Sequence, residues 1–150
     1  MGSYHAEDYV QGIDVPWGMV WLPDGDMLVT EREGEIYRVR EGEIIGKLKG
    51  VPKVEASGQG GLLDIKLHPD YANNGWLYLS YSSKQGKGRG SHTAIMRARL
   101  KGDSLVDSKV LYKGTPNEKG GRHYGSRIAF DAAGYLYFSI GDRGRRDENS

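Results

Sequence analysis

The segment at residues 18–32 reads GMVWLPDGDMLVTER, and its pattern recurs twice further along the chain. The second copy, LLDIKLHPDYANNGWLYLSYS, covers residues 62–82, and the third, SRIAFDAAGYLYFSIGDRG, covers residues 126–144. Each copy has an alternating apolar strand, a turn that contains Asp and Gly, and a more apolar strand that ends in Thr or Ser. Asp-Gly and Asn-Gly pairs tolerate the positive φ that a tight hairpin turn requires. The pattern therefore predicts three β-hairpins.

Further strands are predicted between these hairpins. Residues 35–39 and 93–100 alternate with a period of two, and shorter candidates follow at residues 44–48 and 109–112. Four strands in each unit of about 40–50 residues are typical of a β-propeller blade. No segment shows sustained helical periodicity, so the chain is predicted to be all-β.

The predicted blades form the N-terminal part of a single β-propeller domain. Blade 1 is expected at about residues 9–50, blade 2 at about 57–113 and the start of blade 3 at about 121–150. Propellers typically have about 4–8 blades, which close into a ring and protect the sheet edges. The two and a half blades predict a fragment of a longer propeller. The alternative is that several copies associate to complete a ring.

The composition excludes several classes of protein. The formal net charge of +1 gives no strong field for nucleic acid or an anionic membrane. No apolar run approaches the ~18–20 residues of a membrane span, and no signal peptide is visible at the start. The 23 glycines and the absence of cysteine fit short strands joined by tight turns rather than a disulfide scaffold or a cysteine-ligated zinc site. No metal-binding motif is present in the sequence.

Two polar residues stand between glycines at equivalent places in the repeat. Gln59 precedes the first strand of blade 2, and His123 precedes the first strand of blade 3. In a propeller these strands line the central channel, and neighbouring glycines let a ligand approach the backbone. The pattern predicts either a site at one channel mouth or turns that simply require glycine.

Asp142 follows the second strand of the hairpin that His123 enters. A carboxylate there could orient an imidazole that acts as a base, or it could cap its own turn. By contrast, His68 lies in the turn of the second hairpin, and we interpret it as a residue that hydrogen-bonds the local backbone. Asp70, Asn73 and Asn74 are explained by the same turn.

Several stretches together resemble the soluble quinoprotein aldose sugar dehydrogenases of the glucose/sorbosone dehydrogenase family. They are PWGM at residues 16–19, LVTER at 28–32, GQGGLLD at 58–64, HPDY at 68–71 and HYGSR at 123–127. Their order and spacing match the family from about Tyr9 to Gly144. Arg122 replaces an aspartate that precedes the histidine in the glucose enzyme, which favours the broader aldose branch.

The resemblance implies a six-bladed propeller that oxidises aldoses at the anomeric carbon to lactones, with pyrroloquinoline quinone (PQQ) and calcium. It implies that His123 is the general base during hydride transfer to the quinone, that Asp142 supports it, and that Gln59 contacts the sugar. The main quinone and calcium ligands are expected beyond Ser150, so no metal ligand is assigned here and the fragment alone is expected to be inactive.

The resemblance also implies an external electron acceptor and a periplasmic or secreted location. Two other functions remain open, which are a non-enzymatic propeller that binds a partner and a sugar lactonase with a metal in its channel. The lactonase would need several carboxylate or Asn ligands, whereas the mouths offer Gln59 and His123. An unpaired sheet edge further predicts self-association of the isolated chain.

Overall fold

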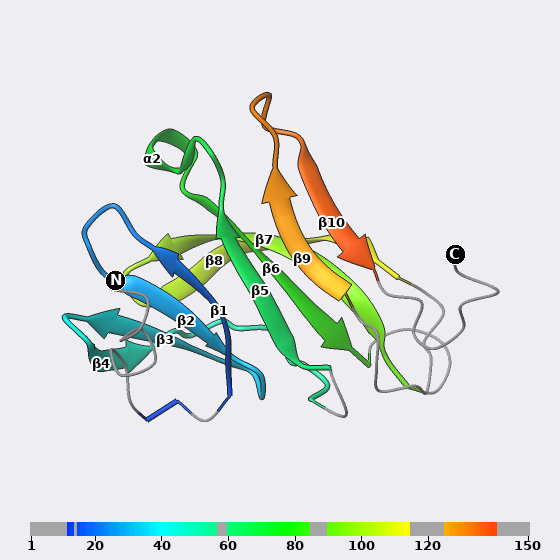
Figure 1. Ribbon diagram of the computed structural model, residues 1–150, viewed down its shortest axis with the longest axis horizontal. Coiled ribbons are helices and arrows are strands. Elements are labelled where there is room, and N and C mark those ends of the chain that lie inside the picture. The colour runs from blue at the N-terminus through cyan, green and yellow to red at the C-terminus, as the bar shows by residue number, and fades with distance from the viewer. Residues whose placement is uncertain (1–11, 14, 57–59, 85–89, 115–124, 141–150) are drawn as a thin grey trace, which may run out of the picture.

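The computed structural model describes residues 12–13, 15–56, 60–84, 90–114 and 125–140. These residues form three antiparallel sheets, and the chain is all-β with a propeller-type arrangement, as predicted (Figure 1). The first sheet contains β1 (Pro16–Trp21), β2 (Met27–Glu31), β3 (Glu35–Arg40) and β4 (Glu43–Lys47). The second contains β5 (Leu62–Leu67), β6 (Trp76–Ser83), β7 (His92–Lys101) and β8 (Ser104–Lys113). The third contains β9 (Gly125–Phe130) and β10 (Leu136–Ile140).

Each sheet follows the chain order, so neighbouring strands are joined by short turns. Glycine occupies the predicted positive-φ position in all three hairpins, at Gly25, Gly75 and Gly134. The second connection differs from the expected tight turn, because the short helix α2 (Tyr71–Asn74) precedes Gly75. Gly75 is the left-handed cap of this helix, and its N–H donates to the Tyr71 carbonyl. The sequence pattern missed α2 because a single turn has no detectable periodicity.

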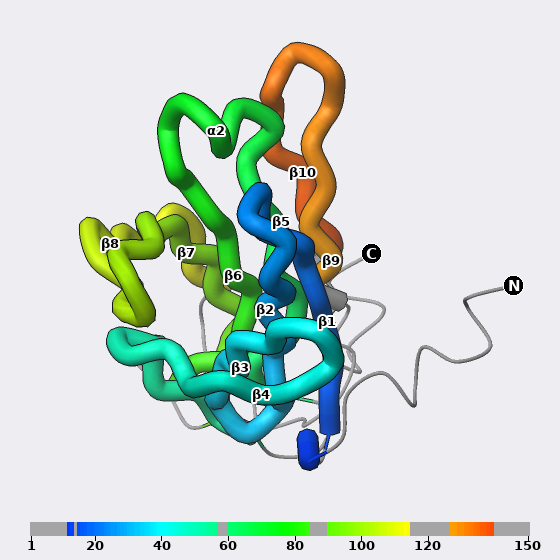
Figure 2. The backbone as a smooth tube through the Cα atoms, turned by 90° about the vertical axis from the view of Figure 1, so that its left-hand side faces the viewer, coloured from blue at the N-terminus to red at the C-terminus, as the bar shows by residue number. Residues whose placement is uncertain are grey.

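The sheets meet along their first strands. β5 lies between β1 and β9 and contacts both. Figure 2 shows β5, β6, β7 and β8 in that order from right to left, with β1 and β9 beside β5. In Figure 1 the first residues of β1, β5 and β9 all lie toward the lower end of the view. This arrangement is that of consecutive propeller blades, whose first strands line the channel.

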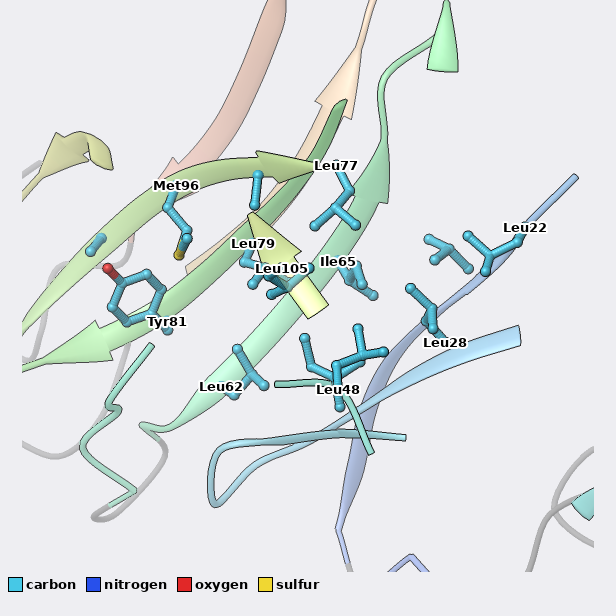
Figure 3. Close-up of a cluster of buried hydrophobic side chains, with 14 residues drawn as sticks. Leu22, Leu28, Leu48, Leu62, Ile65, Leu77, Leu79, Tyr81, Met96 and Leu105 are labelled. Carbon is cyan, nitrogen blue, oxygen red and sulfur yellow. The ribbon is translucent and has the colours of Figure 1, made fainter. Parts of the chain in front are cut away.

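Two apolar layers hold the sheets together. The larger layer lies between the first and second sheets (Figure 3) and includes Leu28, Leu62 and Leu79. The other layer packs Tyr78 and Ile95 of the second sheet against Ile128 of the third. The second sheet is therefore covered on both faces, which explains why β6 is buried along almost its whole length.

Candidate functional site

The three predicted site residues, Gln59, His123 and Asp142, lie outside the described residues. The described strands that follow or precede them in the chain are β5, β9 and β10. Gly125, two residues after His123 in the sequence, is the register partner of Ile140, which stands two residues before Asp142. β5, which begins three residues after Gln59, packs beside β9. The structure thus brings together the strand ends nearest to these residues in sequence, and the residues themselves remain predictions.

The first two strands of each sheet form a hairpin, and each hairpin has a register shift at which a hydroxyl group accepts a backbone hydrogen bond. The ladder between the first and second strand of each sheet shifts register near the start of the first strand. At each shift a backbone N–H of the first strand donates to a Thr or Ser hydroxyl of the second strand. The pairs are Gly18 to Thr30 at 2.8 Å, Asp64 to Ser80 at 2.9 Å and Arg127 to Ser139 at 3.1 Å. Thr30, Ser80 and Ser139 therefore have a structural role that the sequence pattern alone did not reveal, and Ser80 lies within β6 rather than at its predicted end.

Side chains at these bulges also connect neighbouring sheets. The Thr30 hydroxyl donates to the Leu63 carbonyl at 2.7 Å, which joins β2 to β5. The Asp64 carboxylate accepts the Ile65 N–H at 3.0 Å and the Ile128 N–H at 2.8 Å, which joins β5 to β9. Asp64 is 2% exposed, so this contact fixes the relative position of two channel-lining strands in a buried setting.

Gly61 has a packing role beside the predicted Gln59 position. A Cβ at Gly61 would lie 2.2 Å from the Arg32 carbonyl oxygen, and the φ of Gly61 is +141°. The same carbonyl accepts the Leu62 N–H at 2.7 Å, while the Gly61 N–H donates to the Ser82 hydroxyl. Close packing of Gly61 against the Arg32 backbone therefore requires glycine at this position.

A cation–π contact spans the first strands near their starts. The Arg127 guanidinium of β9 lies 4.3 Å from the centre of the Trp17 ring of β1, although β5 lies between these strands. Arg127 is exposed and Trp17 is half-buried. The contact joins residues 110 positions apart in the sequence, and each of them lies at a register shift in its strand pair, where a bulge can re-aim a side chain. The sequence carried no signal for this pair.

His68 has the structural role that was predicted for it. Its Nδ1 accepts the Asp70 N–H at 3.0 Å, and its ring packs edge-on against Phe130 at 5.3 Å. Asn73 hydrogen-bonds Asp70, and Asn74 accepts the Trp76 N–H, so the turn accounts for these polar residues as well.

The described residues hold no cluster of three or more His, Cys, Asp or Glu side chains that could bind a metal ion.

A pocket of about 320 Å³ lies between the first two sheets, at the ends of the first strands that are opposite to their starts. Leu22, Asp24, Arg38 and Tyr71 are among its lining residues. In the described part of the chain, no helix has the length and apolar character needed to cross a membrane.

Comparison with known proteins relates most of the chain to one family. The glucose/sorbosone dehydrogenase family matches residues 13–150. The chain is 38% identical to "Aldose sugar dehydrogenase YliI" of Escherichia coli (strain K12), over 89% of this chain and 37% of that protein. It is 32% identical to "Quinoprotein glucose dehydrogenase B" of Acinetobacter calcoaceticus, over 95% of this chain and 32% of that protein. It is also 30% identical to human "Hedgehog-interacting protein", over 91% of this chain and 22% of that protein. The chain thus spans about a third or less of these relatives' length.

Solved structures show the same relationship. A structure described as glucose dehydrogenase matches with a TM-score of 0.85 and 34% identity, covering 91% of this chain and 44% of that one. The PQQ-bound aldose sugar dehydrogenase of Streptomyces coelicolor matches with a TM-score of 0.71 and 35% identity, covering 91% of this chain and 40% of that one. The repeated hairpins, the propeller-type arrangement and the match over residues 13–150 lead to one conclusion: the chain belongs to the glucose/sorbosone dehydrogenase family.

Proposed function

We propose that the protein to which this chain belongs oxidises aldose sugars at the anomeric carbon to lactones, using PQQ. The observation that supports this most directly is the match of almost the whole chain to relatives named aldose sugar dehydrogenase and quinoprotein glucose dehydrogenase. The PQQ-bound relative of known structure supports the choice of cofactor. An external electron acceptor and a periplasmic or secreted location belong to the same proposal.

His123 is proposed as the general base. Its imidazole would take the proton of the anomeric hydroxyl while the anomeric hydrogen leaves with its electron pair, so that the carbon becomes the lactone carbonyl carbon. Asp142 would accept a hydrogen bond from the imidazole and stabilise its charged form, and Gln59 would contact the sugar. The pairing of Gly125 with Ile140 supports the assignment, because it brings the sequence neighbours of His123 and Asp142 to one end of the hairpin.

The bound quinone supplies the two-electron acceptor of this reaction. Calcium binds several oxygen ligands, often from carboxylates, and the described residues hold no group of three or more His, Cys, Asp or Glu side chains that could bind a metal ion. We therefore propose that the calcium ligands and most of the quinone site lie in other parts of the protein, and that the 150-residue chain alone is inactive.

The assigned base is tested by His123→Ala in the full-length protein. We expect kcat to fall about 10²–10⁴-fold at saturating quinone, which is the usual contribution of general acid–base catalysis. Quinone binding, followed by absorbance, serves as the control for an intact fold. Wild-type turnover in this variant would exclude His123 as the base, and aldose-dependent dye reduction by the isolated chain with quinone and calcium would contradict its predicted inactivity.

A second candidate is a propeller that binds another protein and has no enzymatic activity. The 30% identity to a relative named as a hedgehog-interacting protein supports it. One measurement distinguishes the two functions, namely whether the full-length protein binds PQQ. No change in the quinone absorbance spectrum on mixing would favour the binding module.

A further inference from the structure

The equivalent bulge position in the first strand of each sheet holds a different type of residue with a different role. Gly18, Asp64 and Arg127 occupy this position, because each donates its backbone N–H to the hydroxyl of the neighbouring strand. Gly18 leaves room for β5, since a Cβ there would lie 3.2 Å from the Asp64 carboxylate. Asp64 is buried and connects β5 to β9. Arg127 stands at the same bulge position but has neither of these packing roles, so its long charged side chain needs another explanation.

Within the described part of the chain, the Arg127 guanidinium has an aromatic partner but no anionic one. Among the residues that the structure describes, it contacts the Trp17 ring at 4.3 Å and pairs with no carboxylate. Arg38, Arg40 and Arg99, by contrast, each hydrogen-bond an aspartate. Asp64, the buried carboxylate on the neighbouring strand, hydrogen-bonds the Ile65 and Ile128 N–H groups and forms no ion pair with Arg127. An exposed guanidinium that pairs with no described carboxylate therefore lies beside the starts of the channel-lining strands.

Stacking on Trp17 prepares this guanidinium to bind an anion. A planar guanidinium that lies over an aromatic ring keeps its N–H groups at its edge, where they can bind both oxygens of a carboxylate. The ring also restricts the side chain before binding, which lowers the entropy cost of the contact. We propose that Arg127, held by Trp17, binds a carboxylate group of a ligand in the channel.

This inference rests on the proposed function for the identity of the ligand. Two ligands of that reaction can carry the carboxylate, namely the quinone cofactor and a sugar acid such as glucuronate used as the aldose. The chemistry at Arg127 is the same in both cases, so two binding measurements separate them.

The test uses full-length protein and the substitution Arg127→Gln. Arg99→Gln is the control, because Arg99 also lies over a tryptophan ring, that of Trp76 at 3.8 Å, but beside the end of β5 that is opposite to its start. Loss of a charged hydrogen bond is expected to weaken binding by ~10-fold or more. If the quinone supplies the carboxylate, Arg127→Gln raises the dissociation constant of PQQ in calorimetry, whereas Arg99→Gln does not. If the sugar supplies it, Arg127→Gln weakens glucuronate binding at saturating PQQ and leaves glucose binding unchanged.

Two further variants separate ligand binding from folding. Trp17→Phe keeps an aromatic ring under the guanidinium and should retain most of the affinity, whereas Trp17→Leu should weaken it in the same direction as Arg127→Gln. Unchanged binding of both PQQ and glucuronate in folded Arg127→Gln would overturn the proposal. If wild-type protein oxidises no aldose but binds either probe through Arg127, the proposed function fails and this inference stands.

Discussion

Gly61 shows how strongly one residue can depend on its neighbour in the next blade. Substitution to Ala would place a Cβ 2.2 Å from the Arg32 carbonyl oxygen, so the backbone of one blade must move. The matched control is Gly25→Ala, where φ is also positive at +93° but no atom lies within 4 Å of the added carbon. We expect Gly25→Ala to cost about 1–2 kcal/mol from backbone strain alone. Gly61→Ala should cost clearly more in urea unfolding, and equal losses would contradict the packing argument.

Asp26 has a carboxyl pKa that two neighbouring arginines lower. Arg40 and Arg38 hydrogen-bond its carboxylate at 2.9 and 2.7 Å, and these contacts lower the pKa of Asp26 from 3.8 to about 2. A carboxyl group whose pKa is lower in the folded state stabilises the fold above its unfolded pKa and loses that contribution as the pH falls.

The stability advantage of wild type over Asp26→Asn should therefore be greatest above about pH 4 and should decline as the pH falls toward 2. Urea unfolding of both proteins across this range measures the difference. Glu35→Gln is the control, because Glu35 forms only an exposed pair with Lys47 at 3.9 Å. A difference between wild type and Asp26→Asn that does not vary with pH would exclude the carboxylate as its source.

At the scale of elements, the bulge hydroxyls connect strands within and between sheets. Thr30 accepts the Gly18 N–H and donates to the Leu63 carbonyl, so one hydroxyl joins β1, β2 and β5. Thr30→Val keeps the shape but leaves the buried Gly18 N–H without its partner, with an expected loss of about 1–3 kcal/mol. Thr30→Ser retains the hydroxyl and should lose less. Thermal and urea unfolding compare the two variants, and a Thr30→Ser protein no more stable than Thr30→Val would contradict the importance assigned to the hydrogen bonds.

At the scale of the whole molecule, the first and third described sheets carry exposed apolar side chains. Met19 and Trp21 on β1 are each 56% exposed, and Tyr137 on β10 is 57% exposed. Contiguous apolar surface and unpaired strand edges promote association. We therefore expect the 150-residue polypeptide to sediment above its monomer mass of 16.6 kDa at micromolar concentration. Trp21→Glu should reduce this association, and a wild-type monomer at all concentrations would contradict the prediction.

The sequence alone determined the class of fold and the family. Alternating apolar residues, turn glycines and strands that end in Thr or Ser are local features, so they predicted the hairpins of β1–β2, β5–β6 and β9–β10 directly. Gln59, His123 and Asp142 could likewise be selected from their places in the repeat, and their roles remain predictions. Local patterns also explained His68, since its partner Asp70 is two residues away.

Only the tertiary structure shows which residues make contacts that connect one blade to the next. Asp64 reaches Ile128, Thr30 reaches Leu63, and Arg127 reaches Trp17 across distances of 33 to 110 residues in sequence. Such pairs depend on how closely the first strands approach and on where bulges redirect side chains, and no local pattern encodes either property. The same reason separates Gly61 from Gly25, which share a positive φ but differ in what lies beside them.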